Sequence, residues 1–213
     1  NLETPQDLTT ESRIWEKAAA IPPFKLSKTL DKPTQSTDVK IFATEDAIYL
    51  RFTCHEANMD QIVMEQTQRD GSVWYDDDFE IRIAPGVPAT AATYPYYTLL
   101  FNPNGVQADI LQAPKTAVIM NEEGMVGTGY GQAARRATGL AWNGDWQVQT
   151  RRHAKSWDGI VTIPLKTIQG AGANHGRLCI SRYEKPNAEF STWPPVSFST
   201  VDQPALFAVW EIK

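Results

Sequence analysis

Short segments in which apolar and polar residues alternate restrict the fold of this chain more than any other feature. Segments 38–44 and 47–55 are two residues apart, and every second residue from Ile48 to Cys54 is apolar. A period of two is typical of a strand that buries one face. The two segments therefore predict an antiparallel hairpin.

The same pattern recurs along the chain. Segments 96–101 and 106–111 flank the turn-forming sequence Asn-Pro-Asn-Gly and predict a second hairpin. There is no strand–helix–strand rhythm and no internal repeat. We therefore expect an all-β fold, an antiparallel β-sandwich of jelly-roll type. The other expected strands are 79–83, 146–152, 159–164, 177–183 and 205–212.

Helical signals are limited to the N-terminal region. Ser12 can cap a short helix that carries Trp15 and Ala18 and ends before two consecutive prolines. With 213 residues and no visible linker, we expect one sandwich domain over 1–213. No apolar run reaches the roughly 18 residues of a membrane-spanning helix.

Charge and cysteine content narrow the classes of partner. A net charge of −5 argues against nucleic acid, whose phosphates require clustered lysine and arginine. Cys54 and Cys179 lie in alternating runs and are interpreted as small buried hydrophobes, with a disulfide as the alternative. The chain begins at Asn1 rather than Met, so we expect a secreted or periplasmic protein whose export signal has been removed.

Two tryptophans lie beside breaker-rich sequences. Trp74 precedes Tyr75 and three aspartates, and Trp193 precedes two prolines. An indole so placed is poorly located to fill a core and well located to offer a flat apolar face. Sugar rings stack on such faces while their hydroxyls bond to polar groups. Trp74 and Trp193 are therefore candidate sugar platforms, with packing over the adjoining loop as the alternative.

The acidic triplet Asp76, Asp77 and Asp78 has three interpretations. It is a solvated turn that begins a strand, a set of oxygen ligands for calcium, or part of a glycosidase carboxylate pair. The last is disfavoured because adjacent acids do not face each other across a cleft. No Ser-His-Asp or Cys-His arrangement indicates nucleophilic catalysis either. We therefore expect a protein that is not an enzyme and needs no cofactor, apart from a structural calcium ion near the triplet.

Several motifs follow one another in a fixed order. They lie at 15–18 (Trp-Glu-Lys-Ala), 47–52 (Ala-Ile-Tyr-Leu-Arg-Phe), 73–81 (Val-Trp-Tyr-Asp-Asp-Asp-Phe-Glu-Ile), 101–105 (Phe-Asn-Pro-Asn-Gly), 163–165 (Ile-Pro-Leu), 180–184 (Ile-Ser-Arg-Tyr-Glu) and 191–194 (Ser-Thr-Trp-Pro). In order and spacing, this set resembles the family 9 carbohydrate-binding modules and their relatives over nearly the whole chain.

The resemblance implies a β-sandwich that holds one or two sugar units between Trp74 and Trp193. It implies Glu80 as the acidic partner of sugar hydroxyls and Arg182 as a further polar contact at the Trp193 end. It also implies a carbohydrate ligand, a structural calcium ion in many members, and a fused or associated catalytic domain.

One departure from the family pattern weakens the implied site. The family's sugar-binding Arg and Asn fall at Thr98 and Leu100 here, so part of the polar grip is replaced. Two alternatives therefore stay open. One is a structural or interaction domain of a larger secreted protein. The other is a haem-binding electron-transfer domain of related fold, with Met59 or Met64 and His153 as axial ligands.

Overall fold

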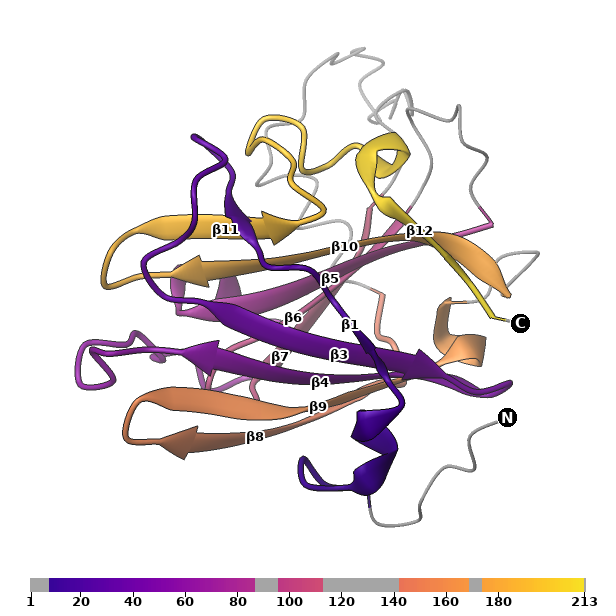
Figure 1. Ribbon diagram of the computed structural model, residues 1–213, viewed down its shortest axis with the longest axis horizontal. Helices are drawn as coiled ribbons and strands as arrows, with labels where there is room; N and C mark the ends of the chain where they lie inside the picture. The colour runs from indigo at the N-terminus through magenta and orange to yellow at the C-terminus, as the bar shows by residue number, and fades with distance from the viewer. Residues whose placement is uncertain (1–7, 87–95, 113–141, 169–173, 213) are drawn as a thin grey trace, which may run out of the picture.

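Two antiparallel sheets stack face to face in the computed structural model, which describes residues 8–86, 96–112, 142–168 and 174–212 (Figure 1). The five-stranded sheet has the order β1 (Ala19–Ala20), β3 (Thr37–Ala43), β4 (Ala47–His55), β9 (Ser156–Pro164) and β8 (Gln147–His153). The seven-stranded sheet has the order β2 (Lys25–Leu26), β11 (Glu189–Trp193), β10 (His175–Glu184), β5 (Asp78–Pro85), β6 (Tyr96–Phe101) and β7 (Gln107–Gln112), with β12 (Ala208–Glu211) also paired to β10. The predicted β-sandwich is confirmed.

Helical structure in the described residues is limited to four 3₁₀ turns. They are η1 (Arg13–Glu16), η2 (Val73–Tyr75), η3 (Leu165–Ile168) and η4 (Pro204–Leu206). The short N-terminal helix expected after Ser12 is a single turn, and the chain passes directly from it into β1. None of these turns has the length and apolar character of a membrane span in the described part of the chain.

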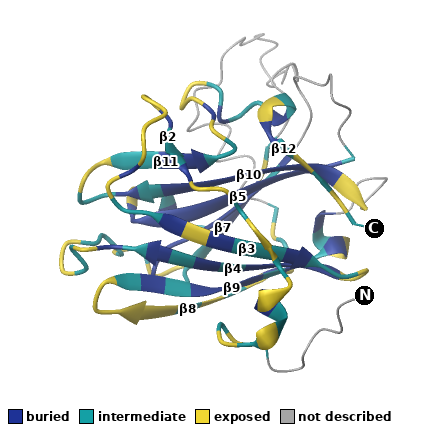
Figure 2. Ribbon diagram, in the orientation of Figure 1, coloured by how far each residue is buried: buried dark blue, intermediate teal, exposed yellow. Residues whose placement is uncertain are grey.

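The core lies between the two sheets and follows the predicted alternation. On β4, Leu50 and Phe52 are fully buried, and on β5 Phe79 and Ile81 face them from the other sheet. The Phe52 and Phe79 ring centroids are 4.9 Å apart. Figure 2 shows the central strands largely buried and the edge strand β8 exposed. Cys54 and Cys179 are buried free thiols, as expected for small hydrophobes.

The register of β5 and β10 determines which side chains leave the core. Ile81 pairs with Ile180, and both lie in the core cluster. Glu80 pairs with Ser181, and Asp78 pairs with Tyr183. Because directly paired residues project to the same face of a sheet, these two pairs lie on the outer face of the seven-stranded sheet.

Candidate functional site

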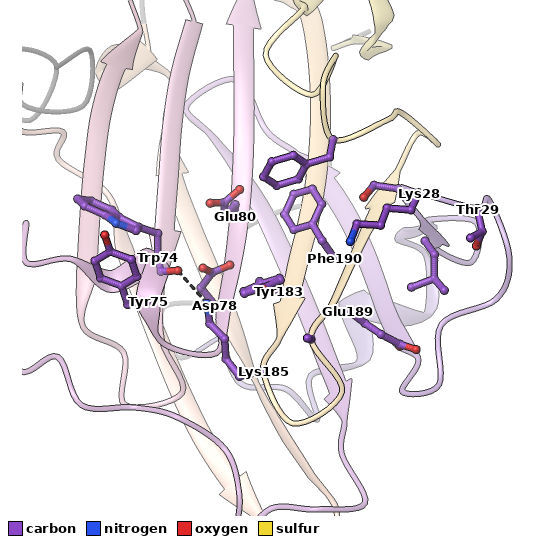
Figure 3. A pocket seen from close by; sticks show the side chains of 14 residues that line it. Lys28, Thr29, Trp74, Tyr75, Asp78, Glu80, Tyr183, Lys185, Glu189 and Phe190 are labelled. Atoms are coloured by element: carbon purple, nitrogen blue, oxygen red, sulfur yellow. Dashed lines mark hydrogen bonds between the residues drawn. The ribbon is translucent and has the colours of Figure 1, made fainter. Parts of the chain in front are cut away.

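A pocket of about 590 Å³ opens on this outer face, at the end of the sheet where β5 begins and β10 ends. That volume is within the range of about 300–1,000 Å³ typical of small-molecule sites. Figure 3 shows two aromatic side chains on one side of the pocket and another aromatic on the opposite side, and between these two sides lie two carboxylates and a tyrosine. In that order these residues are Trp74, Tyr75, Phe190, Asp78, Glu80 and Tyr183.

The first wall consists of Trp74 and Tyr75, both on the 3₁₀ turn η2. Val73, at the start of this turn, is fully buried against Leu100 on the outer face of the sheet. This anchor leaves the next two rings at the rim, with centroids 6.0 Å apart. Tyr75 is 68% exposed. The turn therefore presents two aromatic surfaces to the pocket.

The opposite wall consists of Phe190 and Phe198. Phe190 lies on β11 beside Tyr183, which it pairs with across β10 and β11. Its ring centroid is 5.3 Å from that of Phe198 in an edge-to-face arrangement and 6.1 Å from that of Tyr183. Phe198 is 53% exposed. The pocket is thus flanked by aromatic rings on both sides.

The floor carries two carboxylates on one strand. Glu80 Oε2 accepts hydrogen bonds from Arg82 and, at 3.1 Å, from Ser181 Oγ, so this side chain is held in place. Asp78 is only 2% exposed. Burial, and then the charge of Glu80, raise the pKa of Asp78 well above its usual value, and the cations of Lys185 and Arg82 offset part of that rise.

Lys185 connects the floor to the first wall. Its Nζ donates to the Trp74 carbonyl at 2.9 Å and lies 3.6 Å from the centroid of the Tyr183 ring. Its backbone amide donates to Asp77 Oδ1 at 3.1 Å. Burial lowers the pKa of Lys185, while Asp78 and the two preceding aspartates oppose that change. This lysine fixes the backbone of the aromatic turn relative to β10.

The other two members of the acidic triplet have a structural role. Asp76 accepts from the backbone amides of Glu65 and Gln66 at 3.0 Å, and Asp77 accepts from the amide of Val63 at 2.7 Å. These carboxylates hold the loop before η2 against β5. Their oxygens already accept N–H groups from the backbone. Across the described ranges, no three side chains of His, Cys, Asp or Glu are grouped to hold a metal. Calcium binding stays a prediction.

The structure brings two of the predicted site residues together and separates the other two. Trp74 and Glu80 line the pocket. Trp193 does not, because it is the last residue of β11 and pairs with Ile180, whose side chain lies in the core. The Trp193 side chain packs against that same core cluster. The predicted binding slot between Trp74 and Trp193 is therefore not formed in this pocket. Phe190, rather than Trp193, lies across the pocket from Trp74.

Arg182 also lies on the inner side of the sheet, since it pairs with Phe79. It is 1% exposed, donates to the His55 carbonyl at 2.8 Å, and forms an ion pair with Glu56 at 3.1 Å. His55 is the last residue of β4. The guanidinium therefore ties the two sheets together, and the predicted contact with a ligand is replaced by this structural role.

The positions of Thr98 and Leu100 agree with the expected register. Leu100 pairs with Glu80 and Thr98 with Arg82, on the outer face. Both are buried, and Leu100 packs under the turn that carries Trp74. At Leu100, where the family resemblance implies a polar group, the chain has an apolar support for the aromatic wall. A guanidinium is present instead on β5, where Arg82 bonds to Glu80.

The residues considered as haem ligands are engaged elsewhere. Met59 packs against the main core cluster. The Met64 sulfur lies 3.2 Å from Arg152 Nη1, and His153 Nε2 lies 3.1 Å from Asp158. Nothing in this arrangement favours a haem site over the pocket on the outer face.

Comparisons with known proteins agree with the fold described above. No protein-family model matches the sequence, and no curated protein matches it significantly. Among solved structures, a candidate carbohydrate-binding protein from Bacteroides uniformis has a TM-score of 0.65 at 15% identity, covering 93% of this chain and 88% of that one.

Two further structures are of a family 9 carbohydrate-binding module from Caldicellulosiruptor kristjanssonii. The complex with glucose has a TM-score of 0.61 at 12% identity, covering 99% of this chain and 92% of that one. The complex with cellotriose has a TM-score of 0.60 at 14% identity, covering 99% and 90%. At such identities the similarity shows that this chain has the fold of those modules.

Proposed function

We propose that this chain is a non-catalytic carbohydrate-binding module that holds one or two sugar units in the pocket on the outer face of the seven-stranded sheet. The observation that carries the proposal is the combination of aromatic walls with a polar floor. Trp74 and Tyr75 face Phe190 and Phe198 across the carboxylates. The shared fold with modules solved with glucose and cellotriose supports the same function.

The pocket fits the chemistry of a sugar ring. The axial C–H groups of a pyranose form apolar faces that stack on aromatic rings, while its hydroxyls project from the ring edge. Aromatic walls would cover the two faces, and Glu80, held by Arg82 and Ser181, would accept a hydroxyl at the edge. A ligand of one or two rings supplies few atoms, so we expect a Kd between micromolar and millimolar, or about −8 to −4 kcal/mol.

The floor carboxylates are arranged for binding rather than for hydrolysis. Asp78 and Glu80 are two residues apart on the same face of β5. A glycosidase needs its two carboxyl groups on opposite sides of the bond that is cleaved. A pair on one side of a ligand cannot take both roles.

We infer that the module serves a polysaccharide-acting partner, fused or associated, in a secreted or periplasmic setting.

Calorimetric titration with glucose and cellotriose tests the proposal. Trp74→Ala and Phe198→Ala each remove one ring from one wall and keep the backbone, and each should weaken binding by about 30-fold, or roughly 2 kcal/mol. Val209→Ala is the control, because Val209 is 72% exposed on β12 and lies outside the pocket. The proposal fails if the parent binds neither these sugars nor a wider panel of oligosaccharides. It also fails if both wall variants bind as the parent does.

A further inference from the structure

Asp78 is a buried carboxylate at the base of the pocket with an unused hydrogen-bonding atom. Its residue is 2% exposed, and its Oδ1 has no hydrogen-bond partner. Most buried polar atoms are bonded, so an unpaired one requires an explanation. The two aspartates before it differ in this respect, because each accepts backbone amides on both oxygens. Within the triplet, Asp78 alone has this deficit, and it is the member that lines the pocket.

The neighbours of Asp78 do not remove this deficit. Lys185 directs its Nζ to the Trp74 carbonyl and to the face of Tyr183. Arg82 donates to Glu80 and to Ser181 Oγ. The nearby cations are thus bonded to other groups, and the carboxylate keeps an unmet acceptor. A carboxylate torsion is broad, so a small rotation turns either oxygen toward the pocket.

We propose that Asp78 is a ligand-contacting residue that works with Glu80 to bind two neighbouring hydroxyls on one edge of a sugar ring. The inference rests on the proposed function of the pocket. Residues two apart on a strand are separated by roughly 7 Å at Cα, and both side chains lie on the face that the pocket covers. Because Glu80 Oε2 is bonded to Arg82 and Ser181, a ligand would use its Oε1 and the unpaired oxygen of Asp78.

This pairing also specifies the chemical class of ligand. Two adjacent acceptors require two adjacent donors, which a vicinal diol supplies and a single alcohol does not. Burial raises the pKa of Asp78, and a backbone hydrogen bond from Tyr183 opposes only part of that rise, so the carboxyl is short of one donor at Oδ1. A hydroxyl from the ligand supplies one. Binding therefore gives Asp78 Oδ1 the hydrogen bond that it lacks in the folded protein without ligand.

Asp78→Ala and Asp78→Asn, titrated with cellotriose alongside the parent, test this inference. The alanine variant loses the acceptor and should bind at least tenfold more weakly, whereas asparagine keeps an acceptor of similar shape and should lose less. Both should melt at or above the parent's temperature, because each removes a buried carboxyl that has one oxygen without a hydrogen-bond partner. Glu211→Gln is the control for removing a carboxylate and should keep its affinity, since Glu211 is exposed on β12 and lies outside the pocket.

The outcomes separate this inference from the proposed function. A parent that binds, with an alanine variant that binds within twofold of it, overturns the role of Asp78 and leaves the pocket as the binding site. An alanine variant that is markedly less stable than the parent shows a structural role and also overturns it. A parent that binds neither cellotriose nor any sugar of the panel overturns the proposed function and this inference together.

Discussion

Replacing Arg182 by methionine tests whether this residue holds the sheets together or contacts a ligand. The Arg182 guanidinium on β10 bonds to the His55 carbonyl at 2.8 Å, to the Ser36 carbonyl at 3.3 Å and to Glu56 at 3.1 Å. Methionine has a similar length but no donor. The substitution removes every one of these bonds and leaves the Glu56 carboxylate, 1% exposed, without its cation.

The expected cost follows from that unpaired charge. Breaking a buried ion pair by removing one partner typically costs about 3–5 kcal/mol, because the other charge remains buried. Changing Glu56 to glutamine in the same protein removes that charge. The double variant should therefore be more stable than Arg182→Met alone, with a coupling of about 1–3 kcal/mol between the two sites.

Urea unfolding followed by circular dichroism measures both quantities. Arg13→Met is the matched control, since the Arg13 side chain is 92% exposed and lies 3.7 Å from Glu16 on the surface. It should change the free energy of unfolding by less than about 0.5 kcal/mol. The reasoning would be refuted by an Arg182→Met protein that unfolds like the parent but no longer binds sugar.

Three further predictions concern stability. Asp76→Ala should lower the free energy of unfolding by about 2–4 kcal/mol. It should also speed hydrogen exchange at the amides of residues 65–66, which donate hydrogen bonds to that carboxylate. Burial raises the pKa of Glu184 to about 7 from 4.5, so the folded state retains a proton that the unfolded state releases. Stability should fall by about 1–3 kcal/mol between pH 4.5 and 7, and Glu184→Gln should flatten that slope. Gly159→Ala places a Cβ 1.9 Å from the Gln149 carbonyl, so β8 should detach from β9, and a melting temperature equal to the parent's would contradict this.

Strand positions could be predicted because alternation is a local property. The segments predicted at 47–55 and 96–101 match β4 and β6, and the strand begun at Phe79 matches β5. The strands β1 and β2 have two residues each and no period to detect. Their existence depends on pairing with β3 and β11, which lie elsewhere in the chain.

The candidate site was predicted only in part. Trp74 was predicted from its neighbours, and Glu80 from the family resemblance. The alternation rule places Arg182 on the face of Ile180, which is inward. Trp193 lies on that same inner face. Because two prolines follow it, Trp193 was interpreted as a loop residue, whereas it is the last residue of strand β11. Phe190 precedes Ser191 on the same strand, so alternation places it on the opposite, outer face. This was the sequence feature that could have indicated an outward-facing aromatic residue.

The role of the acidic triplet could not be read from the sequence. Asp76 bonds to the amide of Glu65, eleven positions earlier, and Asp77 bonds to that of Lys185, which is 108 positions later. Local composition shows three adjacent charges and nothing about such partners. Only the folded chain shows that both carboxylate oxygens of Asp76 and of Asp77 accept hydrogen bonds, whereas Oδ1 of Asp78 accepts none.

The location of a bound sugar relative to the seven tryptophans gives the most direct test. Indole N–H signals in a two-dimensional ¹H–¹⁵N spectrum, assigned with Trp74→Phe and Trp193→Phe variants, can be followed during addition of cellotriose. A ligand held between the two aromatic walls should shift the Trp74 signal and leave that of Trp193, packed against the core, nearly unchanged. A large shift at Trp193 with none at Trp74 would contradict the pocket as the binding site.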